Sequence, residues 1–269
     1  FDGKIAFVGL PDQTASLRII AKQLKIQNKI EYFLGPMVGI LMENEVIKMI
    51  KILSKSKSEI IKLRWRDGEW PGKLYGKFID KEIRIEKFYY NYLLPFYCSN
   101  ESLIQDDFAN ELSDISVADA WLPEYEDIGK GWSLVQSKTF KGDKLLNDIY
   151  KSKKISIEKI NISKALRMHE HMIDFKKRGS KYRKKILKFL FIPVPKDYNL
   201  KIKFNFLRYI IEAIILLIIF VCKTNLFRFI MSKINQNFLG FIFSNFRIFW
   251  KKITKDVKRK GLYDNIESN

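Results

Sequence analysis

The chain has 269 residues, which is enough for one large domain or for one domain with an appendage. Hydrophobic residues make up 47% and charged residues 29% of it, and this balance excludes both a disordered chain and a polytopic membrane protein. The formal net charge of +19 indicates either an anionic partner (nucleic acid, an acidic protein, an anionic membrane or a phosphate-rich cofactor) or only the lysine-rich composition of an AT-rich genome.

The cysteine content limits the redox chemistry of the chain. Cys98 and Cys222 are too few for a disulfide scaffold, and they cannot supply the thiolates of an iron–sulfur cluster. A reducing cytoplasm is therefore the expected compartment. Ile5–Leu10 is too short for the apolar core of a signal peptide, so we expect no secretion signal there.

The first half of the chain alternates short apolar runs with helical patterns. Strands are expected at Lys4–Gly9, Ile30–Gly35 and Ile60–Arg66, with helices over Ala15–Leu24 and Glu43–Leu53 between them. Strands that alternate with helices imply parallel pairing, so the pattern predicts parallel strands and an α/β core.

The middle of the chain is richer in strands. Leu74–Ile79 and Glu82–Phe88 are typical of a hairpin, Tyr89–Tyr97 has a helical pattern, and further strands are expected at Asp114–Ala120 and Trp132–Thr139. A helix is expected over Gly142–Tyr150, where Asp143 can accept amide hydrogens of the first turn.

After about Lys151 the chain becomes helical and rich in lysine. The dense cationic run Lys176–Lys185 has two readings, contact with an anionic partner or an ordinary solvated helix surface. No recognisable nucleic-acid-binding module accompanies it, so we expect no nucleic-acid partner.

The last part of the chain is strongly apolar and basic. Tyr209–Val221 is apolar apart from Glu212 and is shorter than the roughly 20 residues that span a bilayer. Three readings stay open: peripheral membrane contact through residues 204–260, a true span, and a soluble helical subdomain. The predicted architecture is therefore α/β, a mixed sheet with flanking helices over residues 1–195, followed by a helical extension over residues 196–269.

One candidate binding segment connects the first expected strand to the first expected helix. The turn Gly9-Leu10-Pro11-Asp12-Gln13 points backbone N–H groups and the helix dipole at whatever lies above the sheet. That geometry suits a flavin phosphate or a cluster, although most turns of this kind are only structural.

A second candidate segment, Arg64-Trp65-Arg66-Asp67-Gly68-Glu69-Trp70-Pro71-Gly72, lies at a strand end. Arginine can pair with phosphate or carboxylate through two hydrogen bonds, tryptophan can stack on a planar ring, and glycine permits close approach of the backbone. The alternative is a twisted hairpin whose surface cations lie on aromatic faces.

A third segment, from Asn110 to Pro123, places Asp114 and Asp119 at the two ends of a short strand. Alternation puts Ser116 on the same face as Asp114. Acids at strand ends can bind ribose hydroxyls, orient a base or cap a neighbouring helix, and capping is the commoner use. A fourth segment, Gly129-Lys130-Gly131-Trp132-Ser133, is a loop into a strand that can wrap a phosphate or form an ordinary turn.

These segments, in this order, resemble the coenzyme F420 hydrogenase/dehydrogenase β-subunit family. Its members show FVGTPCQ, GLFCG, RYRGGGWPG, NELADISVGDAWLPE and GKGWSLV, and this chain reads FVGLPDQ, LGPMVG, LRWRDGEWPG, NELSDISVADAWLPE and GKGWSLV. The likeness runs from about Lys4 to Gly142, and the string from Asn110 to Glu124 is long and specific.

The resemblance implies flavin-dependent electron transfer. Members of the family bind FAD and a [4Fe–4S] cluster and exchange electrons with the deazaflavin coenzyme F420, so FAD is the expected cofactor, F420 is a candidate substrate, and the candidate partner is a redox subunit. By their place in the motifs, the expected cofactor-binding residues are Gly9, Pro11, Gln13, Arg64, Arg66, Gly68, Trp70, Asn110, Asp114, Ser116, Asp119 and Lys130.

The chain departs from the family at each cluster cysteine. Asp12 stands in the Pro-Cys-Gln motif, Val38 in Phe-Cys-Gly, and Ser102 and Gln105 in Cys-x-x-Cys. Iron in such clusters needs soft, anionic thiolates, so we expect no [4Fe–4S] cluster and no resident metal. Ala118 also replaces the glycine of SVGDAW, which narrows the space beside it by one methyl group.

Two functions therefore compete: a cytoplasmic flavin oxidoreductase of this family, and a degenerate, non-catalytic member that acts as a binding or scaffold protein, in one version at a membrane surface. No catalytic proton donor can be assigned from the sequence. His169 and His171 point in different directions on an expected helix, so they cannot share a metal and are expected to be exposed.

Overall fold

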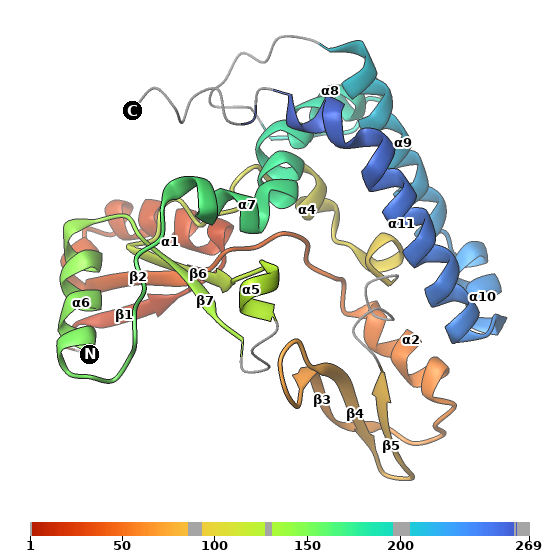
Figure 1. Cartoon of the computed structure of the whole chain (residues 1–269), viewed down its shortest axis with the longest axis horizontal. Helices are drawn as coiled ribbons and strands as arrows, with labels where there is room; N and C mark the ends of the chain where they lie inside the picture. Colours follow the sequence, from red (N-terminus) through yellow and green to blue (C-terminus); the bar gives the residue numbers. More distant parts are fainter. Residues whose placement is uncertain (1, 86–92, 127–130, 196–204, 261, 263–269) are drawn as a thin grey trace. The chain divides into compact units, whose positions relative to one another are not determined.

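The computed structural model describes residues 2–85, 93–126, 131–195, 205–260 and 262, which fall into two compact units (Figure 1). Unit 1 contains Phe1–Gly39 and Asp106–Lys177, and unit 2 contains Ile40–Gln105 and Arg178–Asn269. Each unit is built from two stretches that are distant in sequence. The division into domains at residue 195 stays a prediction.

Unit 1 is built on a four-stranded mixed sheet with the strand order β1-β2-β6-β7. The strands β1 (Ile5–Val8), β2 (Ile30–Pro36) and β6 (Ile115–Asp119) run parallel, and β7 (Ser133–Ser137) pairs antiparallel with β6. The carboxyl ends of β2 and β6 therefore lie side by side, at the edge where ligands bind in open α/β sheets.

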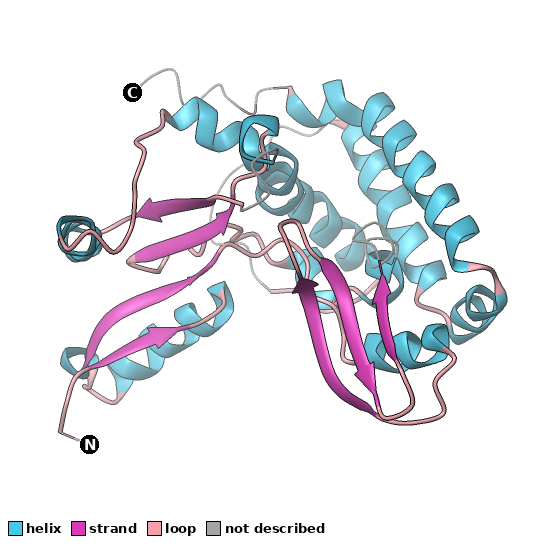
Figure 2. Ribbon diagram, turned by 60° about the horizontal axis from the view of Figure 1, so that its bottom comes forward, coloured by secondary structure: helices cyan, strands magenta, loops and turns pink. Residues whose placement is uncertain are grey.

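Helices flank this sheet, as the sequence predicts (Figure 2). The connection from β1 to β2 contains α1 (Pro11–Gln23) and the short 3₁₀ turn η1 (Gln27–Lys29), α5 (Pro123–Glu126) lies between β6 and β7, and α6 (Phe140–Lys151) and α7 (Ile162–Ile173) follow β7. Ala21 of α1 packs with Ile30 and Phe33 of β2 in a small apolar core.

The predicted cap of α6 is wrong. The helix begins before Asp143, and the hydroxyl of Thr139 accepts the N–H of Gly142 at 3.2 Å. A threonine hydroxyl next to the first turn satisfies an amide that Asp143, already inside the helix, does not reach.

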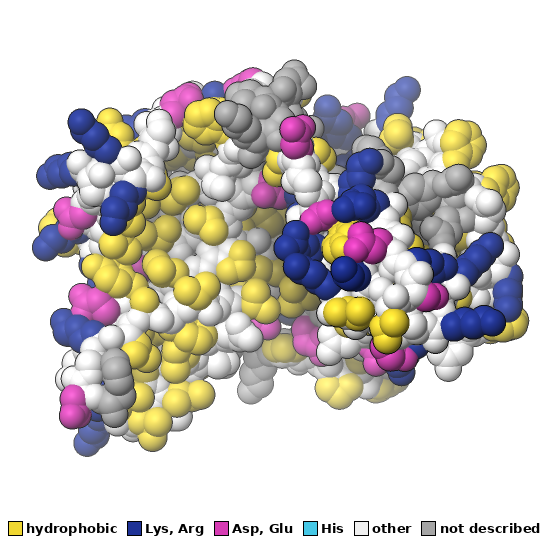
Figure 3. All heavy atoms as spheres, turned by 90° about the horizontal axis from the view of Figure 1, so that it is seen from below, with side chains coloured by type: hydrophobic (Ala, Val, Ile, Leu, Met, Phe, Trp, Pro, Cys, Tyr) yellow, Lys and Arg dark blue, Asp and Glu magenta, His cyan; other side chains and the backbone are white. Residues whose placement is uncertain are grey.

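One face of the unit 1 sheet is apolar and accessible. Val8, Val117 and Val135 lie on the same face of neighbouring strands and are 69%, 41% and 43% exposed. Figure 3 shows a surface of unit 1 on which hydrophobic side chains gather. Sheets with parallel strands are usually covered on both faces, so this one is open to an unusual degree.

Unit 2 contains a three-stranded antiparallel sheet formed by β3 (Ile60–Asp67), β4 (Lys73–Phe78) and β5 (Glu82–Ile85). The predicted hairpin is confirmed, except that residues 86–88 of its second strand lie outside the described residues. The prediction of parallel pairing for Ile60–Arg66 is wrong, because β3 pairs antiparallel with β4 in a separate sheet.

The alternation within β3 explains this pairing. Lys62, Arg64 and Arg66 are exposed, while Leu63 and Trp65 between them are partly buried. A strand with one solvent-exposed face and one buried face is typical of antiparallel sheets, whereas parallel strands are usually apolar on both faces. Figure 3 shows lysine and arginine side chains gathered on the surface of unit 2.

The rest of unit 2 is helical, which confirms the predicted helical C-terminal part. The helices are α2 (Glu45–Ser54), α4 (Asn100–Ile104), α8 (Ser180–Phe189), α9 (Phe206–Cys222), α10 (Asn225–Lys233) and α11 (Gln236–Arg259), and the π-helical turn η2 (Asp174–Gly179) precedes α8. Residues 93–97 are helical, while 89–92 of that predicted helix lie outside the described residues. Ile50, Leu74, Phe96 and Cys222 belong to one buried core.

The cationic run Lys176–Lys185 is not a solvated helix surface, so that reading is wrong. Lys176 and Arg183 are fully buried, and Lys184 nearly so. Arg183 donates to the carbonyl oxygen of Leu103 at 2.7 Å and pairs with Glu212 of α9 at 2.5 Å. Burial of Arg183 and Lys184 follows from the packing of α8 against α9 and α4.

Among the helices of the described residues, no single one is both long and apolar enough to cross a bilayer. The pair α9 and α10, which is bent by 71° at its junction, has the length and the apolar composition for this only when the two are taken together.

Candidate functional site

A pocket of about 450 Å³ lies in unit 1 at the carboxyl ends of β2 and β6. The lining is mainly apolar, with a small number of polar and ring-bearing side chains. It consists of Pro36, Met37, Gly39, Phe108, Val117, Ala118, Asp119, Trp121, Ser133, His169 and Met172. Size and lining are those of a site for a small molecule.

The polar part of the lining is small and contains no cation. Asp119 at the end of β6, Ser133 at the start of β7 and His169 of α7 supply its polar side-chain groups. A carboxylate, a hydroxyl and an imidazole can hydrogen-bond the polar edge of a ring. A phosphate group would find no counter-ion among the residues that line this pocket.

His169 is buried, so the expectation of an exposed side chain is wrong for it, whereas His171 is exposed as expected. Its Nε2 lies 2.8 Å from the carbonyl oxygen of Asp119, and its ring lies 5.2 Å from that of Phe108. Because a carbonyl oxygen only accepts, Nε2 carries the proton. Burial lowers the pKa of His169 below its ordinary 6.5, so the imidazole is neutral and Nδ1 is a proton acceptor.

A glycine permits the close approach of α7 to the loop after β2. A Cβ atom built on Gly39 would lie 2.4 Å from Sδ of Met172, which is too close for any side chain without a shift. Gly39 therefore lets Met172 reach the pocket wall.

The predicted residues Gly9, Gln13 and Asn110 come together at the ends of β1 and β2. Nδ2 of Asn110 donates to the carbonyl oxygen of Gly9 at 2.9 Å, and Oε1 of Gln13 accepts the N–H of Leu10 at 2.9 Å. A Cβ on Gly35 would lie 2.1 Å from the Gly9 oxygen. These contacts tie the strand ends together and cap α1, next to Pro11 in its first turn.

Asp114 and Ser116 lie away from the pocket residues, toward the other end of β6. The buried carboxylate of Asp114 accepts from the N–H of Phe33 at 2.8 Å and from the Thr139 hydroxyl at 2.7 Å. Ser116 accepts from Nζ of Lys138 at 2.5 Å. Both side chains hold elements of the fold, and of the two acids that bracket β6 only Asp119 lines the pocket.

Arg64, Arg66, Gly68 and Trp70 lie in unit 2, around the turn between β3 and β4. Arg64 pairs with Asp67 at 2.9 Å, and Nη1 of Arg66 donates to the carbonyl oxygen of Pro71 at 3.3 Å. Gly68 has φ +85°, a conformation that favours glycine. Lys130 lies outside the described residues.

The positions that correspond to the cluster cysteines carry no soft donor. Asp12 is exposed in the first turn of α1, and Val38 is buried with its N–H bonded to the carbonyl oxygen of Phe108 at 2.9 Å. Ser102 is buried and accepts the N–H of Leu41 at 2.9 Å. In place of ligands, these side chains make ordinary packing and hydrogen-bond contacts.

The cysteines of the chain do not replace them. Cys98 and Cys222 are both buried in unit 2, and burial raises the pKa of each thiol to about 11. Such thiols stay protonated, whereas an iron–sulfur cluster needs thiolates. The donor set present therefore does not fit a [4Fe–4S] cluster.

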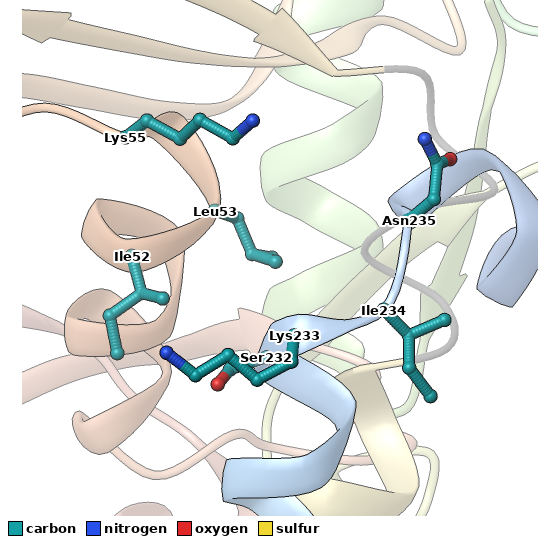
Figure 4. A pocket seen from close by; sticks show the side chains of 7 residues that line it. All are labelled: Ile52, Leu53, Lys55, Ser232, Lys233, Ile234 and Asn235. Carbon is teal, nitrogen blue, oxygen red and sulfur yellow. The ribbon is translucent and has the colours of Figure 1, made fainter.

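A second pocket of about 450 Å³ lies in unit 2, between the end of α2 and the junction of α10 with α11 (Figure 4). Its polar lining is cationic or neutral, with Lys55, Lys233, Ser232 and Asn235 around Ile52, Leu53 and Ile234. It has neither an aromatic ring nor an acid, so its chemistry suits a small anion better than a redox ring.

Of the residues that line the pocket, the sequence analysis named only Asp119 as a cofactor-binding residue, and it missed the others, among them His169 and Met172 of α7. A signal for them exists, because Ala165, Met168, His169 and Met172 share one face of a helix at spacings of three and four. That pattern predicts burial of His169 together with the methionines, although it does not reveal what the helix packs against.

Comparisons with known proteins agree with the motifs. Residues 2–163 match the family model that describes the C terminus of the coenzyme F420 hydrogenase/dehydrogenase beta subunit. A solved structure of the F420-reducing [NiFe] hydrogenase complex from Methanosarcina barkeri contains a chain of similar fold, with a TM-score of 0.50 and 14% identity over 73% of this chain and 66% of that one. The comparison with curated proteins gives no match.

Proposed function

Because the chain belongs to the coenzyme F420 hydrogenase/dehydrogenase β-subunit family, whose members are redox proteins, we propose that it is a flavin-dependent oxidoreductase working without an iron–sulfur cluster. FAD is the proposed cofactor, and F420 or a similar deazaflavin the proposed electron partner. The observation that carries the proposal is the ring-sized pocket at the carboxyl ends of β2 and β6.

The residues of this pocket fit the ring system of a flavin. When bound, a flavin supplies hydride chemistry, which needs no thiolate-bound iron. Trp121 and Met37 would hold the faces of the ring, and Ser133 and Asp119 would hydrogen-bond its polar edge. The buried, neutral His169 would accept a hydrogen bond at Nδ1. The phosphate groups of FAD would need cations from outside this lining.

The test is equilibrium binding of FAD to the full chain, followed by quenching of flavin fluorescence. Trp121→Ala removes a ring contact, and we expect affinity to fall roughly tenfold. Trp250→Ala is the matched control, because Trp250 belongs to α11 and does not line the pocket. Absence of FAD binding by the wild-type chain, or equal binding by both variants, would count against the proposal.

A redox partner protein is part of the proposal. The chain of similar fold comes from a hydrogenase complex, and the present chain spans 66% of that chain's length. Transfer of a hydride to a diffusible deazaflavin needs no one-electron relay. We therefore propose a partner that binds this chain but does not receive single electrons from it through an iron–sulfur centre.

A second candidate function is that of a binding or scaffold protein without catalysis. The replacement of each cluster cysteine by Asp12, Val38, Ser102 and Gln105 favours it, because relaxed selection on redox chemistry would have that effect. This second function would be supported if the wild-type chain is folded but binds neither FAD nor F420, and if Trp121→Ala leaves its thermal stability unchanged.

A further inference from the structure

The helix α9 has its charged side chains inside and its apolar side chains outside. Glu212 is fully buried and pairs with Arg183 at 2.5 Å and with Arg208 at 2.8 Å. Leu207 and Leu217, on the other side of the same helix, are 59% and 62% exposed. In a helix that faces only water the distribution is the reverse, so the outer side of α9 is suited to an apolar surrounding.

The helix α11 repeats this pattern over more turns. It packs against α9, and the two helices run side by side in Figure 1. Its inner side carries the buried Leu239 and Thr254. Its outer side exposes a stripe of large side chains at helical spacing, formed by Phe238, Phe241, Ile242, Phe246, Phe249 and Ile253.

Cations continue the stripe of α11 where its aromatic part ends. Lys252 is exposed and follows Phe249 by three residues, so it lies at the edge of the same face, and the exposed Lys255 lies one turn further on, just beside that face. The only acid of α11 is Asp256, which is exposed and lies two turns after Phe249 on the same face. The C-terminal turns of the helix, with Lys251, Lys252, Lys255, Lys258 and Arg259, therefore keep a net positive charge next to the apolar stripe.

A cationic pocket opens beside the start of α11. Lys55 and Lys233 line it together with Ser232 and Asn235, at the junction of α10 with α11 (Figure 4). No acid is among its lining residues. A phosphate-bearing headgroup at this place would meet two positive charges and two neutral polar side chains.

The combination of an apolar aromatic stripe with neighbouring lysines favours a lipid surface over a protein as the binding partner. The cores of protein–protein interfaces are enriched in aromatic residues but depleted in lysine. Helices that lie in a bilayer interface place phenylalanine and leucine on one face and lysine or arginine next to it, where anionic headgroups attract the cations. The side chains of α11 follow the second pattern.

We propose that α9, α10 and α11 form a docking surface for an anionic lipid bilayer. The outer stripes of α9 and α11 enter the boundary between headgroups and acyl chains, and Lys252 and Lys255 lie at the headgroup level. The pocket at Lys55 and Lys233 takes an anionic headgroup. The contact is peripheral, and it does not depend on whether the pocket of unit 1 holds a flavin.

Flotation of the full chain with lipid vesicles tests this proposal. We expect the chain to float with vesicles that contain phosphatidylglycerol and to bind vesicles of phosphatidylcholine alone much more weakly. The double variant Phe241→Ser and Phe249→Ser should lower partitioning roughly a hundredfold, because two rings lose apolar burial. Lys252→Gln with Lys255→Gln should lower partitioning into anionic vesicles roughly thirtyfold at low salt.

Phe140→Ser is the matched control, since Phe140 is 85% exposed on α6 in unit 1. It should float as the wild-type chain does, and circular dichroism should show the same helix content for every variant. A wild-type chain that stays at the bottom of the gradient would overturn the proposal. An oligomer in lipid-free buffer that Phe241→Ser with Phe249→Ser dissociates, without any vesicle binding by the wild type, would assign the surface to protein contact instead.

Discussion

At the scale of single residues, the chemistry of the unit 1 pocket depends on an imidazole that is kept neutral. His169 donates from Nε2 to the carbonyl oxygen of Asp119 and is almost fully buried, so a proton at Nδ1 would add a charge in a place with little water. The pKa of His169 is lowered for this reason. A neutral imidazole in the pocket can accept a hydrogen bond at Nδ1 from a bound molecule, whereas a charged one could only donate.

The first prediction concerns the acid stability of the chain. The folded-state pKa of His169 lies below the unfolded value near 6.5, so the unfolded chain binds a proton first as the pH falls. This group therefore stabilises the fold above about pH 6.5, and its contribution is lost as the pH falls through the folded-state pKa. Urea unfolding at pH 8 and at pH 5 should show a smaller loss of stability on acidification for His169→Gln than for wild type.

Glutamine at position 169 keeps a hydrogen-bond donor for the Asp119 carbonyl oxygen but does not titrate. The variant therefore separates the effect of protonating His169 from the effect of losing its hydrogen bond. The matching substitution at an exposed position of the same helix is His171→Gln, against which the effect of His169→Gln is compared. An identical loss of stability in all three proteins would show that His169 is charged or accessible in the folded state.

A second prediction concerns the space beside Ala118. Ala118 lines the pocket, and leucine there would fill part of the volume that a ring must occupy. We expect Ala118→Leu to weaken FAD binding about 10- to 100-fold, because overpacking costs of this kind amount to about 1–3 kcal/mol. Ala118→Gly should bind FAD at least as well as wild type.

The control for this prediction is Ala6→Leu, the same change at an exposed position of β1 that does not line the pocket. Binding isotherms for the three variants and wild type give the comparison. If Ala118→Leu binds FAD with wild-type affinity, the flavin is held elsewhere.

Single residues of the candidate site could be predicted unevenly from the sequence. The motif that contains Asp119 and Trp121 correctly marked a strand end that the structure places at a pocket. Asp114 and Ser116 are in the same motif, but hydrogen bonds within the fold take up both side chains. A motif predicts which segment lies near a site. Which side chains of that segment line the site depends on how the strands pair.

At the scale of elements, the buried ion cluster of α8 and α9 is the feature that most constrains unit 2. Arg183 and Arg208 share the carboxylate of Glu212, and all three side chains are nearly inaccessible to water. A Cβ on Gly179 would lie 2.7 Å from Nη1 of Arg183 and 2.9 Å from Oε1 of Glu212, so the glycine leaves room for the cluster. Removal of one member leaves the other charges buried without a counter-ion.

The third prediction follows from this cluster. Glu212→Gln leaves two buried guanidinium groups facing a neutral amide, and we expect a loss of about 3–5 kcal/mol in the free energy of unfolding. Glu124→Gln is the control, because Glu124 pairs with Lys164 at 2.7 Å on the surface and should contribute less than about 1 kcal/mol. Chemical denaturation of the variants measures both values, and a loss for Glu212→Gln as small as that for Glu124→Gln would contradict the account.

The elements themselves could largely be predicted, whereas their partners could not. The runs that form β1, β2, β6 and β7 and the helices α1 and α2 follow from apolar spacing. The pairing of β3 was wrongly inferred from chain order, although its alternating Lys62, Arg64 and Arg66 already favoured an antiparallel sheet. The burial of Arg183 was missed because spacing shows which residues share a helix face, but it does not show that the carboxylate of Glu212 from a distant helix lies opposite Arg183.

At the scale of the whole molecule, the proposed flavin site does not depend on the positions at which the cluster cysteines are replaced. The residues at the carboxyl ends of β2 and β6 form a pocket that fits a ring, while Asp12, Val38, Ser102 and Gln105 cannot bind iron as thiolates would. Cys98 and Cys222, with thiol pKa values of about 11, offer no substitute. We therefore expect a protein that handles hydride without relaying single electrons through an iron–sulfur cluster.

The absorption spectrum of the full chain, purified without oxygen and then reconstituted with FAD, iron and sulfide, tests this claim most directly. We predict the resolved bands of a bound flavin that bleach on reduction, with no iron retained after desalting. A broad iron–sulfur shoulder accompanied by about four irons per chain, or a colourless protein, would contradict it.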